Sequence, residues 1–351
     1  MLDIISIPTF SLNPTSLSLY NSRFLRNSSG KFEKSKLTES QKKDSLKNIY
    51  GDNFQVEKRF HNFKISEQSH KSIMQKINWL YFLAKSKSVK TLSGKEIYNF
   101  KINFITLTLP AMQEHPTAEI TTNCLNQFLT ELKKIYKIEN LVWRLEFQAN
   151  GNVHYHIVTD TYIDYYVVLK HWNRVINKLG YVDRYAEKHS KMSLNEYVNT
   201  YNKGGKVDFA TMKNRYIKGR SFNWKVPNSV DVKCVTSGKQ IAFYISKYFS
   251  KKEKSGAICN KLDTKENSMG LRLWFCTRSL SKLKKIRDFI PAFDIDLLSI
   301  VLKCKKIFKC VHEYCTTYFY DFSELENSGK AVLSRIMRDY ALGLGYKPSV
   351  V

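Results

Sequence analysis

Two histidines alternate with a tyrosine in the segment His154-Tyr155-His156, eight residues after a glutamate at position 146. Alternate side chains of a β-strand lie on the same face, so both imidazoles point the same way if this segment is a strand. Two imidazole nitrogens and one carboxylate oxygen suit a divalent metal that keeps open coordination positions. We therefore predict that Glu146, His154 and His156 bind a metal, the alternative being surface histidines paired with carboxylates.

The loop between residues 146 and 154 decides which side chains join the histidines. The Asn150-Gly151 pair favours a two-residue turn, but that turn would mix polar and apolar residues on each face. A three-residue loop, 150–152, instead pairs Gln148 with His154 and Glu146 with His156, and it collects the apolar residues on one face. The residues expected on the histidine face are Arg144, Glu146 and Gln148, and those on the buried face are Trp143, Leu145, Phe147, Val153, Tyr155 and Ile157. Gln148 is a second candidate ligand, and Arg144 is a candidate phosphate contact.

A second group of reactive side chains lies in the segment IAFYISKYFSKK. Tyr244 and Tyr248 are four residues apart, and Lys247 and Lys251 each follow a tyrosine by three. Residues four apart share one face of a helix, so both hydroxyls could serve one site. The alternative is an amphipathic helix with core tyrosines, because the chain contains 21 tyrosines.

The composition indicates a polyanionic partner. Lys and Arg number 57 against 31 Asp and Glu, which gives a formal net charge of +26. Such an excess is typical of proteins that bind nucleic acid or an anionic membrane. No apolar run reaches the roughly 18 residues of a membrane span, so we predict nucleic acid and no membrane. Seven scattered cysteines indicate reduced thiols and a cytoplasmic location.

Regular elements surround both motifs. The predicted helices cover residues 66–86, 117–137, 164–180 and 238–251, and the predicted strands cover 97–110, 141–148, 153–159, 229–235 and 270–278. This order favours an α+β fold, a central antiparallel sheet with helices packed on one face, plus inserted and terminal helical segments. Residues 1–65 are expected to form a basic, partly disordered arm. Residues 66–290 are expected to form the main domain, with an insertion around 185–228, and residues 291–351 a C-terminal extension of unknown role.

Together these motifs resemble the HUH endonucleases of rolling-circle replication, and among them the replication initiators of single-stranded DNA phages of the microvirus type. The resemblance covers roughly residues 100–285, and the histidines precede the tyrosines, as in replication initiators; relaxases have the reverse order. The stretches that carry it are FITLTLP at 104–110, HYHIV at 154–158, YISKYFSKK at 244–252 and LRLWFCTRSL at 271–280.

The resemblance implies an enzyme that nicks and rejoins single-stranded DNA at a replication origin. A tyrosine, Tyr244 or Tyr248, would form a 5′-phosphotyrosine and leave a 3′-OH that primes rolling-circle replication. Lys247 and Lys251 would neutralise phosphate, and the metal would be Mg²⁺ or Mn²⁺. Host helicase and polymerase are implied partners, and the oligomeric state stays open.

A phage initiator works in the host cytoplasm, and one from a eukaryotic virus in the nucleus. Two alternatives use the same residues differently. A metal-dependent hydrolytic nuclease would use water as nucleophile, and a non-enzymatic nucleic-acid-binding protein would use the hairpin as a structural metal site.

Overall fold

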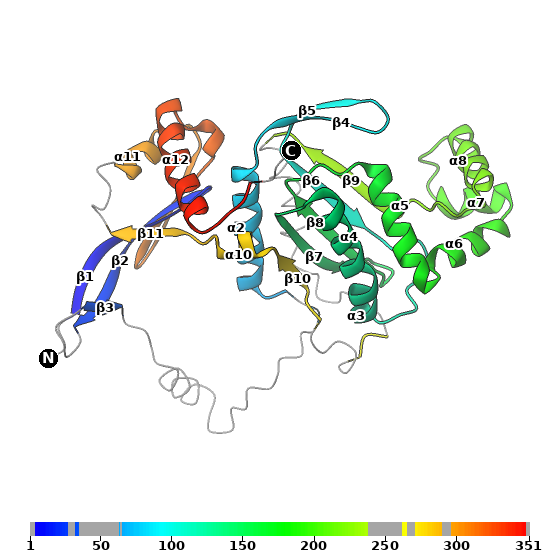
Figure 1. The fold of residues 1–351 in the computed structure, drawn as a ribbon, viewed down its shortest axis with the longest axis horizontal. Helices are drawn as coiled ribbons and strands as arrows, with labels where there is room; N and C mark the ends of the chain where they lie inside the picture. The colour runs from blue at the N-terminus through cyan, green and yellow to red at the C-terminus, as the bar shows by residue number, and fades with distance from the viewer. Residues whose placement is uncertain are drawn as a thin grey trace, which may run out of the picture. The chain divides into compact units, whose positions relative to one another are not determined.

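The protein is seen in a computed structural model, which describes residues 4–26, 32–34, 63, 65–237, 262–264, 271–289 and 296–348. The chain divides into two compact units, one of residues 1–60 and 281–346 and the other of residues 61–280 and 347–351. Each unit has its own antiparallel sheet (Figure 1). None of the helices within the described ranges is long and apolar enough to cross a membrane.

The larger unit is built on a five-stranded antiparallel sheet with the order β10-β7-β8-β6-β9. Its strands are β6 (Ile102–Leu107), β7 (Leu141–Phe147), β8 (Val153–Thr159), β9 (Val230–Val235) and β10 (Trp274–Cys276). Every residue of the central strand β6 is buried, because both faces of the sheet are covered. Mixed helices and antiparallel strands confirm the predicted α+β class.

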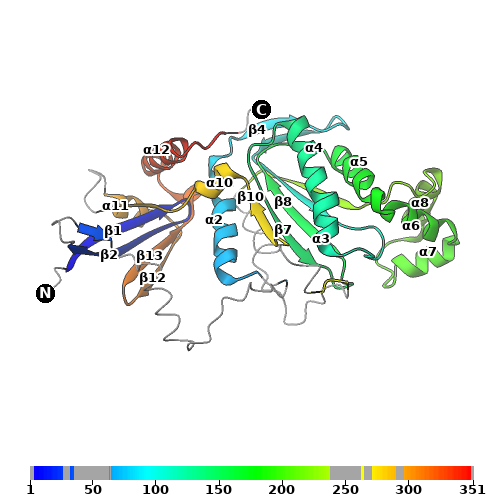
Figure 2. The ribbon, with the colours of Figure 1, turned by 60° about the horizontal axis from the view of Figure 1, so that its bottom comes forward.

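One face of this sheet carries the apolar core. It is covered by α3 (Thr117–Ile120), the π-helical turn η1 (Thr121–Leu125), α4 (Asn126–Tyr136) and α5 (Tyr165–Ile176), as Figure 2 shows. Trp143, Tyr155 and Trp172 meet in this core, each at most 4% exposed. The Trp172 indole Nε1 donates to the Thr108 carbonyl at 2.7 Å, so its polar edge is satisfied inside the core.

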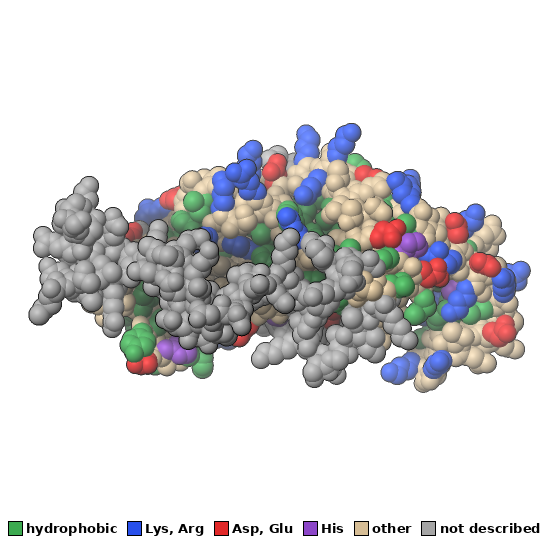
Figure 3. All heavy atoms as spheres, turned by 90° about the horizontal axis from the view of Figure 1, so that it is seen from below, with side chains coloured by type: hydrophobic (Ala, Val, Ile, Leu, Met, Phe, Trp, Pro, Cys, Tyr) green, Lys and Arg blue, Asp and Glu red, His purple; other side chains and the backbone are tan. Residues whose placement is uncertain are grey.

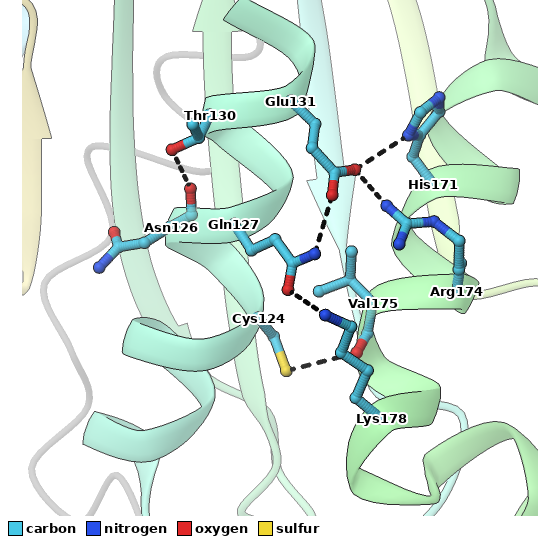
Figure 4. A network of polar contacts seen from close by, with 9 residues as sticks. All are labelled: Cys124, Asn126, Gln127, Thr130, Glu131, His171, Arg174, Val175 and Lys178. Atoms are coloured by element: carbon cyan, nitrogen blue, oxygen red, sulfur yellow. Dashed lines mark hydrogen bonds and ion pairs between the residues drawn. The ribbon is translucent and has the colours of Figure 1, made fainter.

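A polar network joins α4 to α5 on the outer side of this layer (Figure 4). The Glu131 carboxylate accepts from Arg174 and lies 3.2 Å from His171 Nδ1, and Gln127 donates to it at 2.8 Å. The hydrogen bond from Arg174 is the main reason that the pKa of Glu131 falls to about 2. His171 is therefore a network residue of the scaffold.

The opposite face is covered in part by α2 (Glu67–Leu83), which contacts β7 and begins at the side-chain cap Ser66. Both ribbon views place α2 across the sheet from α4 and α5 (Figures 1 and 2). Burial, followed by the nearby charge of Arg144, lowers the pKa of His70 on α2. Helices thus lie on both faces, one more than the predicted arrangement has.

The long strand predicted over 97–110 is interrupted. It consists of β5 (Glu96–Phe100) and β6, and β5 pairs with β4 (Lys87–Lys90) in a separate two-stranded sheet. Asn99 has a φ of +56°, in the left-handed region, which ends the regular extended backbone before β6. The predicted helix over 66–86 is confirmed, and the 3₁₀ turn η2 (Asn177–Leu179) continues α5 to Gly180.

Three helices lie between α5 and β9, where an insertion is expected. They are α6 (Tyr181–Ser190), α7 (Leu194–Tyr201) and α8 (Phe209–Ser221). His189 is 2% exposed and is surrounded by aromatic rings, among them Tyr185, Tyr201 and Trp224. Basic side chains project from the surface of these helices (Figure 3).

The smaller unit has a six-stranded sheet with the order β11-β1-β2-β13-β12, and β3 also pairs with β2. Its strands are β1 (Ile4–Asn13), β2 (Ser16–Arg26), β3 (Phe32–Lys34), β11 (Ile286–Phe289), β12 (Ile307–His312) and β13 (Cys315–Tyr320). Its helical elements are α11 (Leu297–Leu302), η4 (Phe322–Glu324) and α12 (Asn327–Gly343), and α10 (Arg278–Lys282) crosses the unit boundary. Regular strands therefore occupy residues 4–26, within the region expected to be a basic arm.

Candidate active site

The β7–β8 hairpin has the predicted facing but a different loop. Glu146 pairs with His154 and Arg144 pairs with His156, so a five-residue loop, 148–152, joins the strands. The predicted partners are therefore wrong by two residues. A shift of two keeps every side chain on its face, and the prediction that Glu146, His154 and His156 share one face is confirmed.

The loop is longer because other parts of the chain hold it. The Asn152 side chain accepts from Gln113 N at 2.9 Å and donates to the Ala111 carbonyl at 2.8 Å. The Gln113 side chain in turn accepts from Val153 N at 2.7 Å. These contacts satisfy the first backbone donor of β8 and fix where that strand begins.

The three candidate ligands lie close together. His156 Nε2 is 3.0 Å from Glu146 Oε2, and the two imidazole rings are 4.7 Å apart between centroids. His156 is 1% exposed, whereas Glu146 and His154 are partly exposed. His154 Nε2 is buried and has no hydrogen-bond partner. A buried, unpartnered nitrogen beside a carboxylate is the kind of polar atom that a ligand commonly satisfies.

The charge states of these groups favour ligand donation. Burial, together with the charge of His156, lowers the pKa of His154 to about 3, so its imidazole is neutral near pH 7. Burial raises the pKa of Glu146, but the hydrogen bond from His156 and the neighbouring charges outweigh it, and the pKa lies below its ordinary value. The pair therefore offers one free nitrogen lone pair and one ionised carboxylate.

Thr106 is a site residue that the sequence analysis missed. It lies on β6 directly opposite His156, and its hydroxyl is 3.3 Å from His156 Nδ1. The imidazole of His156 is thus held from both sides, by Thr106 and by Glu146. The only sequence signal is the alternation of FITLTLP, in which Thr106 is a polar residue among buried ones.

The two predicted DNA contacts lie in different environments. Arg144 shares the histidine face but is 1% exposed, so its guanidinium presents almost no surface to DNA. Gln148 follows β7 at the start of the loop and is partly exposed. Of the two, only Gln148 stands where a bound strand could reach it.

Tyr244, Lys247, Tyr248 and Lys251 lie outside the described residues. The described chain before them ends at Ser237, after β9, and resumes at residues 262–264. There the Asp263 carboxylate accepts from both the backbone N and the hydroxyl of Thr117 at 2.7 Å. Asp263 therefore fixes the chain to the start of α3 shortly after the tyrosine segment.

Within the described ranges, no three His, Cys, Asp or Glu side chains stand in an arrangement ready to hold a metal ion. The direct hydrogen bond between Glu146 and His156 explains this for the candidate ligands, because each occupies the other's donor atom. His154 alone among the three leaves its outer nitrogen unpartnered.

Comparison with known proteins matches the sheet and the tyrosine segment together. Neither the curated proteins nor the solved structures include a significant match to this chain. Residues 102–253 match the family described as replication-associated protein ORF2. The matched range begins with β6, contains the β7–β8 hairpin and extends past Tyr244 and Tyr248. This match supports a replication initiator family for the chain.

Proposed function

We propose that the chain is an HUH-type replication initiator that nicks and rejoins single-stranded DNA through a 5′-phosphotyrosine. The observation that carries the proposal is the convergence of Glu146, His154 and His156 on one sheet face, with His154 Nε2 buried and unpartnered. This hairpin lies inside the range that matches the replication-associated family. The resemblance to initiators of the microvirus type supports the same assignment.

The residues of the site are suited to hold a divalent metal, Mg²⁺ or Mn²⁺. Neutral His154, ionised Glu146 and the Thr106-oriented His156 supply two nitrogen donors and one oxygen donor. Glu146 and His156 would have to exchange their mutual hydrogen bond for the metal. A bound metal would stabilise negative charge on the phosphate oxygens of the DNA.

The nucleophile in this proposal is the hydroxyl of Tyr244 or Tyr248. Its oxygen forms a bond to phosphorus while the bond from phosphorus to the 3′ oxygen breaks, so the departing strand gains a 3′-OH. The phosphate ester energy is kept in the phosphotyrosine, and rejoining therefore requires no ATP. Lys247 and Lys251 supply positive charge next to the phosphate. The large positive net charge binds the rest of the single strand.

The site is tested by His154→Ala, with His171→Ala on α5 as a matched histidine control. We expect His154→Ala to lower covalent adduct formation by at least about 100-fold, because it removes a ligand. Its affinity for single-stranded DNA should stay within about threefold, since binding rests on many Lys and Arg contacts. Adduct formation at the wild-type rate in His154→Ala would remove this face from the mechanism.

A further inference from the structure

A second site lies on the other face of the same sheet, at its β10 edge. There a pocket of about 400 Å³ opens between η1 and α4 on one side and β7 and β10 on the other. Figure 2 shows these elements together, with β10 beside β7 and α3 and α4 in front of the strands. The volume is in the range of small-molecule sites, about 300–1,000 Å³.

Aromatic rings form the floor of this pocket. Trp143 on β7 and Phe275 on β10 are direct neighbours across the two strands, and their rings are 6.5 Å apart and nearly parallel, at 29°. Trp143 is 4% exposed, whereas Phe275 is partly exposed. Phe275 therefore presents an aromatic surface on which a planar group could stack.

Two cations converge on the same ring. Lys133 Nζ lies 5.6 Å from the centre of Phe275, and Arg272 Cζ lies 5.9 Å from it. Within the described chain, neither forms an ion pair, and no Asp or Glu is among the residues that line the pocket. Like charges gathered without a counter-charge favour an anionic ligand. Burial also lowers the pKa of Lys133, which shows that its ammonium is partly removed from water.

The wall facing the rings is polar and irregular. Thr122 and Asn126 lie four residues apart on η1 and α4 and line the pocket with exposed side chains. Their hydroxyl and amide groups can donate and accept hydrogen bonds with the edge of a base. The π-helical turn η1 widens the helix at this point, and such turns often mark functional sites.

We propose that this pocket binds one nucleotide, with the base stacked on Phe275 and the phosphate between Lys133 and Arg272. The nucleotide could belong to a single DNA strand or be free in solution; both offer the same base and phosphate. This site goes beyond the proposed nicking function, because Trp143 and Phe275 lie on the sheet face opposite Glu146 and His154.

The test measures binding in a His154→Ala background, in which the site for DNA cleavage is disabled. A labelled oligothymidylate is titrated by fluorescence anisotropy, and thymidine monophosphate and deoxyadenosine triphosphate are titrated by calorimetry. The variants are Lys133→Ala, Arg272→Ala and Phe275→Leu. Lys134→Ala is the matched control, because Lys134 is exposed on the same helix, outside the pocket lining.

Lys133→Ala and Arg272→Ala should each bind at least about tenfold more weakly than the Lys134→Ala control. For the oligonucleotide, each should also reduce the slope of log affinity against log salt by about 0.7, the value for one phosphate of a single strand. Phe275→Leu should weaken binding about tenfold through lost stacking, with the salt slope unchanged. Thermal melts of each variant confirm folding, and the two cation variants test the pocket even if Phe275→Leu does not fold.

Weaker binding confined to the oligonucleotide would identify a DNA strand as the ligand, and weaker binding of the nucleotides would identify a free nucleotide. Both results support the pocket. Affinities equal to the Lys134→Ala control for all three ligands would overturn it. Failure of the wild-type protein to form a covalent adduct would refute the nicking proposal and leave this result unaffected.

Discussion

Tyr155 and His154 are neighbours on β8, but the two faces of the sheet treat their polar atoms differently. The Tyr155 hydroxyl, on the helix-covered face, is 2.7 Å from the Thr121 hydroxyl, and the residue is fully buried. On the other face, His154 Nε2 is buried without a partner. A fold normally satisfies the polar groups that it buries. The contrast indicates that the first face is built for stability and the second for a ligand.

The largest expected effect is on the helix-covered face. Trp172→Ala removes a fully buried indole and its hydrogen bond to the Thr108 carbonyl. We expect it to lower the free energy of unfolding by about 3–5 kcal/mol. Urea denaturation measures the loss, with His171→Ala on the same helix as the control. A loss below about 1 kcal/mol would show that this layer is not the stabilising core.

An intermediate effect is expected from pH on the ligand face. The pKa of His154 is about 3 in the folded protein, below the ordinary 6.5, so the unfolded chain binds this proton first. Stability from His154 is therefore complete above about pH 6.5 and is lost as the pH falls toward 3. In EDTA, His154→Gln should show a shallower loss of stability between pH 6.5 and 5 than the wild type. Parallel curves for the two proteins would contradict the buried, neutral state of His154.

The smallest effect is expected at the outer surface of α4. The pKa of Glu131 is about 2, mainly because Arg174 donates to it, so its contribution is present above about pH 4.5 and is lost as the pH falls toward 2. Arg174 is 48% exposed, and solvent screens this pair. Glu131→Gln should lower the free energy of unfolding by about 0–1 kcal/mol at pH 7. The difference should shrink in 1 M salt; a larger loss that salt leaves unchanged would indicate packing instead of charge.

The facing of the hairpin could be predicted from sequence because side chains alternate with a period of two. Its pairing could not, since the loop is held by Gln113 and Asn152, and the contact between them spans 39 positions of the chain. Thr106 was missed for a related reason, because only the sheet order brings β6 beside β8. Local patterns specify faces, whereas distant contacts specify partners.

The N-terminal strands show the same limit. Leu12 and Leu17 are fully buried and pair across the β1–β2 turn, but serines and asparagines lie around them in sequence. The partners that complete their sheet, β11 and β13, come from residues after 285. A segment whose neighbours lie about 300 positions away resembles a polar arm when it is considered by itself.

The most direct test of the central claim concerns the nucleophile. A labelled pool of random-sequence single-stranded DNA is incubated with the protein and Mn²⁺, and covalent products are separated on a denaturing gel. The comparison covers wild type, Tyr244→Phe, Tyr248→Phe and the double variant, which remove only hydroxyl groups. We predict a DNA-linked protein band for the wild type and each single variant, and none for the double variant. Cleavage by the double variant at the same positions would show that water is the nucleophile and would contradict the phosphotyrosine mechanism.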